Sequence, residues 1–176
     1  PPIDLVVKDY AGEIFKGLST GTVPEDHKEF LEDCLRNDVT GCLLLLTEWQ
    51  KGTDLFYEQA METFIKLMNT GDRLGNYRLA VAMSKCERGE LWTGRLEPEV
   101  DLFNVHLPRM TDLLRRKIPK KNLRFFAVST FGVLERNDPR PNRTDEMGKE
   151  RTKSVLRKPS AWKPYGLIEP LNWLSS

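Results

Sequence analysis

The sequence predicts an α/β fold built on a three-layer, mostly parallel sheet. Strand-like apolar segments alternate along the chain with amphipathic helical segments, and such alternation implies right-handed crossovers between parallel strands. The strand-like segments are almost continuously apolar, as is typical of parallel strands that are buried on both faces. With 176 residues, the chain is expected to form one domain, residues 1–176, with a substantial core.

The first strand is predicted at residues 3–8, close to the start of the sequence. A strand in this position needs neighbours to pair with, so we expect the amino-terminal part of the domain to be missing. A glycine-containing segment, residues 17–22, then predicts a mobile connection. The next helix is expected to begin near Pro24, because Leu31 and Leu35 follow at helical spacing and proline suits a first helical turn.

The middle of the chain predicts two further strands and one long helix. Residues 41–46, with the sequence GCLLLL, form the second predicted strand. The helix is predicted over residues 54–68, where apolar residues recur at helical spacing and can face a core. A turn that contains two glycines then leads into the third strand, predicted over residues 77–83.

The last part of the chain predicts a helix over residues 100–117 and a strand over residues 123–128. Pro108 should kink or break that helix, since proline has no backbone N–H and its ring clashes with the preceding turn. Residues 135–164 are charged, contain prolines and show little hydrophobic periodicity, which predicts a flexible insertion. An apolar cluster at residues 167–174 predicts a closing helix.

Composition argues against several classes of function. The 27 basic and 26 acidic residues leave a net charge of +1, which gives no general affinity for polyanions, so no nucleic-acid binding is predicted. Cys34, Cys42 and Cys86 lie far apart without a CxxC pair, which indicates reduced thiols and no zinc site. The longest apolar run, residues 41–46, is too short to span a bilayer, and no signal peptide is visible. We therefore expect a cytoplasmic protein without a membrane span.

Polar or glycine-containing steps follow the predicted strands. Asp9 and Gly12 form an Asp-x-x-Gly step after the first strand, and residues 84–87 and 129–132 follow the third and fourth. Ligands of open α/β sheets bind outside the carboxyl ends of the strands, so these steps predict one ligand-binding edge. Taken separately, each step is also ordinary turn chemistry.

The order and spacing of these steps resemble the GTPase branch of the P-loop NTPases. Asp9-x-x-Gly12 resembles the DxxG motif, SKCE at 84–87 a variant of the [NT]KxD motif, and STFG at 129–132 the SA[KLG]-type loop. The DYAGE start and the KPYGLIEPLNWL end are similar to TRAFAC-type or bacterial double-GTPase domains. The resemblance runs from Ile3 to about Leu174, the latter two-thirds of a G domain. It lacks the first strand, the switch threonine and the Walker A loop, since no GxxxxGK[ST] occurs in the chain.

The resemblance implies a phosphate and metal site at the first step. Asp9 would hold Mg²⁺ through water, and Gly12 would present its backbone N–H to a terminal phosphate, because no Cβ blocks the approach. Glu13 occupies the position at which small GTPases place a glutamine that orients the attacking water, so it is the catalytic candidate.

The resemblance implies a guanine site at the later steps. The stem of Lys85 would lie against the purine ring, and Glu87 would accept hydrogen bonds from N1–H and the exocyclic amine, a donor pair that adenine lacks. Backbone groups around Ser129 and Thr130 would complete the pocket, and Ser84 is also among the nucleotide-binding residues. The family has aspartate where this chain has Glu87, asparagine or threonine in place of Ser84, and alanine in place of Thr130.

The expected function is therefore a GTP-binding and GTP-hydrolysing switch domain, with Mg²⁺ and GTP as ligands and the other domains of the same parent chain as partners. Without a phosphate loop, these residues alone should bind nucleotide poorly and hydrolyse essentially none. Two alternatives stay open at this point. One is a nucleotide-free pseudo-GTPase that serves as an interaction module, and the other is a different doubly wound enzyme in which Asp9 serves another phosphate chemistry.

Overall fold

The structure, a computed structural model, describes residues 13–23, 25–47, 49–50, 52–147 and 152–176. The described part is a mixed α/β fold with a three-stranded parallel sheet of order β1-β2-β3 and two small antiparallel sheets. The parallel strands are β1 (Gly41–Leu46), β2 (Arg78–Met83) and β3 (Leu123–Ala127). These positions confirm the strands predicted at 41–46, 77–83 and 123–128, whereas the one predicted at 3–8 lies outside the described residues.

The helices connect the strands and close the chain. The helices predicted from about Pro24, over 54–68 and over 167–174 are confirmed. Their bounds, with those of the short 3₁₀ and π segments η1 to η4, are α1 (Glu13–Thr20), α2 (Glu25–Leu35), α3 (Thr53–Thr70), η1 (Gly89–Leu96), η2 (Glu99–Phe103), α4 (Asn104–His106), α5 (Pro108–Lys117), η3 (Lys120–Asn122), η4 (Pro159–Ala161) and α6 (Glu169–Ser175). No described helix has the length and apolar character that crossing a membrane requires.

Helix α1 corrects the prediction of a connection at residues 17–22, because the helix continues to Thr20. Ile14 and Leu18 lie one helical turn apart and are only 7% and 3% exposed. Phe15 packs edge-to-face on Tyr57 of α3, with ring centroids 5.5 Å apart. Burial of this apolar side against α3 stabilises a helix that glycine alone would weaken. Gly21, at φ +69°, then ends it.

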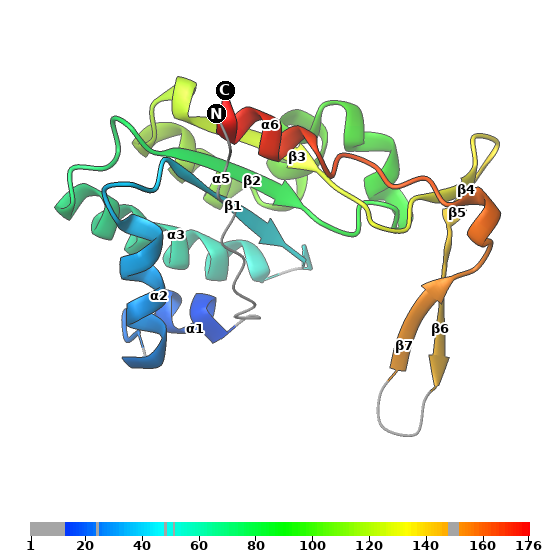
Figure 1. The fold of residues 1–176 in the computed structure, drawn as a ribbon, viewed down its shortest axis with the longest axis horizontal. Coiled ribbons are helices and arrows are strands. Elements are labelled where there is room, and N and C mark those ends of the chain that lie inside the picture. Colours follow the sequence, from blue (N-terminus) through cyan, green and yellow to red (C-terminus); the bar gives the residue numbers. More distant parts are fainter. Residues whose placement is uncertain (1–12, 24, 48, 51, 148–151) are drawn as a thin grey trace.

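The central strand β2 is covered on both faces, and its residues alternate between these faces. Leu79, Val81 and Met83 of β2 belong to a core shared with α1, α3 and α5, whereas Ala80 and Ala82 belong to a smaller core beneath α6. Figure 1 shows α6 on one side of the sheet and α3 with α1 on the other. The strand β2 is therefore buried from Leu79 to its end.

The predicted break at Pro108 is confirmed. Helix α4 ends at His106, and α5 begins with Pro108, whose missing N–H would have no partner within the helix in any case. The next two N–H groups, of Arg109 and Met110, donate to the two carboxylate oxygens of Asp54 on α3, at 3.0 and 3.1 Å. One carboxylate thus caps α5 and joins it to α3.

Asp54→Ala should lower the free energy of unfolding by about 1–2 kcal/mol, because it removes a charged cap from a helix N-terminus. Urea denaturation of the protein measures this loss. Asp54→Asn keeps one oxygen acceptor without the charge and should lose roughly half as much. Equal stability of wild type and Asp54→Ala would show that the cap contributes nothing.

The predicted insertion at 135–164 holds much of the antiparallel structure. Strand β4 (Val133–Glu135) pairs with β5 (Asp138–Pro141), and β6 (Arg143–Met147) pairs with β7 (Thr152–Leu156). Figure 1 shows the β6–β7 hairpin projecting away from the parallel sheet. The predicted flexibility of this stretch stays a prediction.

Candidate functional site

The connections that follow the parallel strands meet at one edge of the sheet. The N–H of Ser84, after β2, donates to the carbonyl of Leu46 at 2.8 Å. The N–H of Cys86 donates to the carbonyl of Val128, after β3, at 3.1 Å, and the N–H of Val128 donates to the carbonyl of Met83 at 2.9 Å. The structure therefore brings together the two steps, at 84–87 and 129–132, that the sequence assigned to base recognition.

Lys85 has the left-handed backbone conformation, with φ +58°. This conformation is uncommon for a residue with a side chain, and residues held in it often lie at functional sites. The residue is half-buried and lines a hollow of about 150 Å³ between the ends of β1 and β2. The other lining residues are Thr47, Trp49, Gln50 and Arg88.

Glu87 is the most unusual residue at this edge. It is only 1% exposed, and neither carboxylate oxygen has a hydrogen-bond partner among the described residues. The hydroxyl of Ser84 and Nε of Arg95 are also buried without partners in that part of the chain. Buried polar groups are normally paired, and an exception calls for an explanation such as a ligand. A concentration of exceptions around the end of β2 therefore marks this edge as the candidate site.

Arg95 and two aromatic residues lie in the neighbourhood of Glu87. The guanidinium of Arg95 lies 4.1 Å from the ring centroid of Trp92 and 5.4 Å from that of Tyr165. The pKa of the Cys86 thiol is raised to about 12, chiefly by burial and also by the charge of Glu87, whereas the charge of Arg95 acts to lower it. Cys86 is therefore a buried, protonated thiol.

Ser129 uses its polar groups within the protein. It is 1% exposed, its hydroxyl oxygen accepts the N–H of Gly132 at 2.8 Å, and its backbone forms two hydrogen bonds with Tyr165, at 2.8 and 2.9 Å. Thr130 is exposed, and its carbonyl accepts the indole N–H of Trp162 at 2.8 Å. Of this pair, only the Thr130 side chain is free to face a ligand.

The segment at residues 162–166 is the part of the site that sequence reasoning missed, because it was assigned to the insertion and the tail. Its signal in the sequence is the glycine that ends it, Gly166, at φ +68°. A Cβ at this position would clash with the carbonyl oxygen of Ala127, so only glycine lets the segment lie against β3.

The phosphate and metal residues of the predicted site cannot be placed beside this edge. Asp9 and Gly12 lie outside the described residues. Glu13 begins α1, and its side chain is outside the described part as well. Within that part, no group of three or more His, Cys, Asp or Glu side chains is arranged to hold a metal ion. The assignments of Asp9 to Mg²⁺ and Glu13 to catalysis stay predictions.

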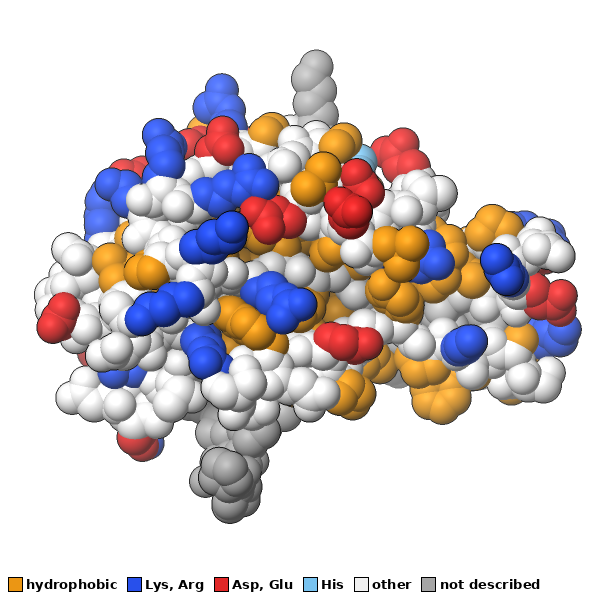
Figure 2. Space-filling view, turned by 90° about the horizontal axis from the view of Figure 1, so that it is seen from above, with side chains coloured by type: hydrophobic (Ala, Val, Ile, Leu, Met, Phe, Trp, Pro, Cys, Tyr) orange, Lys and Arg blue, Asp and Glu red, His pale blue; other side chains and the backbone are white. Residues whose placement is uncertain are grey.

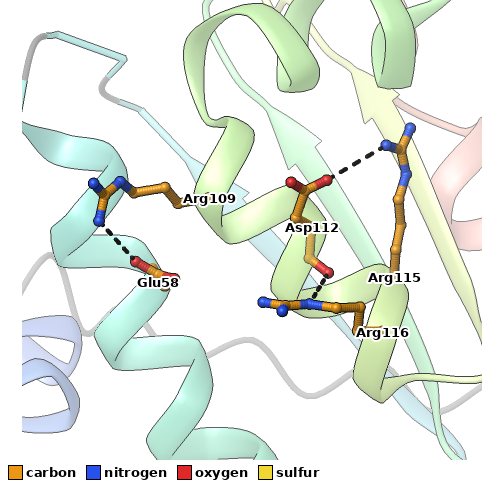
Figure 3. Close-up of a pocket in the computed structure, with 5 residues that line it drawn as sticks. All are labelled: Glu58, Arg109, Asp112, Arg115 and Arg116. Atoms are coloured by element: carbon orange, nitrogen blue, oxygen red, sulfur yellow. Dashed lines mark hydrogen bonds and ion pairs between the residues drawn. The ribbon is translucent and has the colours of Figure 1, made fainter.

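A larger hollow, of about 530 Å³, lies between α3 and α5, away from the sheet edge (Figure 3). Arg109 pairs with Glu58 at 3.7 Å, and Asp112 lies 3.9 Å from Arg115 and accepts a hydrogen bond from Arg116 at its carbonyl. Each of these charges already has a partner and faces solvent. We therefore place the candidate site at the sheet edge, where Ser84, Glu87 and Arg95 have buried polar atoms without partners among the residues that the structure describes.

A basic surface lies at the opposite end of the sheet from the candidate site. Figure 2 shows Lys and Arg side chains gathered on the left part of the α6 face, near the start of β3. The exposed basic residues at the end of α5, in its connection to β3 and in β3 are Lys117, Lys120, Lys121 and Arg124. Such a run is typical of a solvated surface.

A scan against protein-family models, a search of curated proteins and a search of solved structures found no match to this chain. This chain is a mixed α/β protein whose three parallel strands end at the same edge of the sheet. Several of its buried polar groups lie at this edge.

Proposed function

We propose that this chain is the latter part of a P-loop GTPase-type switch domain, within a larger protein of the TRAFAC or double-GTPase kind. Asp9 would hold Mg²⁺, Gly12 would contact the terminal phosphate, and Glu13 would orient the attacking water. A phosphate loop supplied upstream would complete the site. The observation that carries the proposal is the buried carboxylate of Glu87 at the sheet edge, which has no hydrogen-bond partner within the described part of the chain.

The arrangement of the two base-recognition steps supports this proposal. In a guanine site, the step with the carboxylate and the following step must contact the same base, so they have to be neighbours. Here they follow adjacent strands, β2 and β3, and the hydrogen bond from Cys86 to Val128 links them. Both lie at the carboxyl edge, where ligands of parallel α/β sheets bind.

The chemistry of Glu87 favours guanine over adenine. A carboxylate with two free oxygens can accept N1–H and the exocyclic amine of guanine together. Adenine presents an acceptor at N1 and a C–H at position 2, so it would leave the carboxylate without that pair of donors. A buried group left unpaired costs free energy, and this penalty is what discriminates between the bases.

The burial of Glu87 adds a requirement. At 1% exposure, the residue can meet a base only after the surrounding loops move apart, so binding would select an open conformation. The same burial favours the second candidate function, a pseudo-GTPase interaction module that keeps the sheet and binds no nucleotide. The two functions differ in whether the protein binds a guanine nucleotide, which can be measured.

The test is the binding of fluorescent GTP, ATP and xanthosine triphosphate analogues to the natural protein that contains this chain. Wild type should prefer GTP. Glu87→Gln should lose roughly 10–100-fold in GTP affinity, the free energy of one charge-assisted hydrogen bond. The variant should gain affinity for the xanthine nucleotide, because the glutamine amide can donate to the C2 carbonyl that xanthine has in place of the amine.

Glu97→Gln is the matched control, since Glu97 is exposed on the same connection and its substitution should change no affinity. Equal affinity of wild type for GTP and ATP, or unchanged selectivity in Glu87→Gln, would refute base recognition by Glu87. A protein that binds none of the three in the presence of Mg²⁺ would favour the interaction module. Translation of the coding sequence upstream of Pro1 tests for the GxxxxGK[ST] loop directly.

A further inference from the structure

The chain leaves the sheet edge to form the two hairpins, and it returns to the edge at the same place. The chain departs through residues 129–132, here called the base loop, forms β4 to β7, and returns through residues 162–166. The return segment pairs with the base loop: Tyr165 and Ser129 exchange two backbone hydrogen bonds, and Trp162 donates to Thr130. The segment by which the chain returns from the hairpins thus contacts the predicted base-recognition loop directly.

Asn142 lies at the junction between the hairpins and the base loop. It connects β5 to β6 and is 0% exposed, which is unusual for an amide side chain. Its backbone N–H donates to the carbonyl of Gly132 at 3.0 Å. Its carbonyl accepts the N–H of Arg157, just after β7, at 3.3 Å.

The side chain of Asn142 adds a second pair of hydrogen bonds. Its Nδ2 donates to the carbonyl of Lys158 at 3.0 Å, and its Oδ1 accepts the N–H of Lys158 at 2.8 Å. The Lys158 ammonium is in turn 2.9 Å from the carboxylate of Glu135 on β4. Asn142 therefore joins Gly132, at the end of the base loop, to Arg157 and Lys158, which follow β7.

We propose that Asn142 is a positioning residue for the base loop, and that it couples this loop to the segment that follows β7. This inference rests on the proposed function. Without the side-chain amide of Asn142, the backbone N–H and carbonyl of Lys158 lose their hydrogen bonds to it. The return segment that follows Lys158 is then held less firmly. The pairing of Tyr165 with Ser129 and of Trp162 with Thr130 then loosens, and the base loop with it.

The first measurement is residue-resolved amide exchange by NMR in wild type and Asn142→Ala. The N–H groups of Ser129 and Gly132 report on the base loop, since they bond to Tyr165 and to the Ser129 hydroxyl. The N–H of Val128 reports on the sheet, since it bonds to Met83. We expect exchange about tenfold faster at Ser129 and Gly132 in the variant, the effect of about one lost hydrogen bond, with Val128 unchanged.

Asn122→Ala is the matched control. Asn122 is also a buried asparagine with two side-chain hydrogen bonds to backbone carbonyls, those of Leu74 and Gly75, but it lies at the start of β3, at the other end of the sheet. Asn122→Ala should leave the difference in exchange rate between the N–H groups of Gly132 and Val128 as it is in wild type. Faster exchange confined to residues 135–161, or raised equally at Val128, would overturn the positioning assignment.

The second measurement is GTP affinity, which should fall about tenfold in Asn142→Ala and stay unchanged in Asn122→Ala. A wild-type protein without guanine selectivity would refute the proposed function, while the exchange data would still decide whether Asn142 positions the loop. Guanine selectivity in wild type with unaltered affinity and exchange in Asn142→Ala would refute the inference alone.

Discussion

Gly166→Ala should lower the free energy of unfolding by more than about 3 kcal/mol, a large loss for the addition of a single methyl group. Gly166 has φ +68°, and a Cβ at this position would overlap the carbonyl oxygen of Ala127. That carbonyl belongs to β3, whose backbone is fixed by its pairing with β2, so it cannot move away cheaply. The clash therefore adds to the intrinsic cost of a left-handed alanine.

Gly21→Ala separates these two costs. Gly21 has nearly the same backbone conformation, φ +69°, but a Cβ there has nothing within 4 Å. Its replacement should cost only about 1 kcal/mol, the penalty for the left-handed conformation. Gly132→Ala should resemble Gly166→Ala, because its Cβ would meet the carbonyl oxygen of Lys163 in the return segment. Urea denaturation curves of the three variants give the comparison, and three equal losses would show that the close contacts do not exist in solution.

Glu87→Met should raise the free energy of unfolding by about 1–4 kcal/mol. A buried carboxylate without partners carries a desolvation penalty that no contact offsets in the described structure. Methionine fills a similar volume, is flexible and needs no partner. The stabilising direction is the informative part, since most substitutions of buried residues destabilise. The same variant should lose guanine selectivity, so stability and function would be opposed at this one residue.

Thermal and urea denaturation without nucleotide measure this gain. Glu97→Met, at an exposed position on the same connection, should change stability by less than about 0.5 kcal/mol. A loss of stability in Glu87→Met would mean that the carboxylate has a partner in solution that compensates its burial, and that its two oxygens are not available to accept from a base.

The sequence by itself determined the elements whose signal is local. Strands β1, β2 and β3 are short apolar runs, α3 repeats apolar residues at helical spacing, and the break before α5 follows from the covalent structure of Pro108. Such patterns reflect which residues lose contact with water, so they can be read without knowledge of the neighbours. The common edge of the steps at 84–87 and 129–132 also followed, because parallel strands end on the same side.

Only the tertiary structure decided features that depend on distant partners. Helix α1 extends through a glycine-containing segment because Tyr57, far along the chain, receives Phe15. The charged stretch after β3 forms hairpins because its backbone groups pair with one another, a choice that composition does not reveal.

The candidate site shows the same division. Sequence reasoning located Glu87 but not its burial, and it missed Tyr165 and Asn142 entirely. Residue type and spacing can place a residue at an edge of the sheet. Which hydrogen-bond partners it finds there is set by segments that approach from elsewhere in the chain. For this reason only the folded structure could show that Glu87 has none among the described residues.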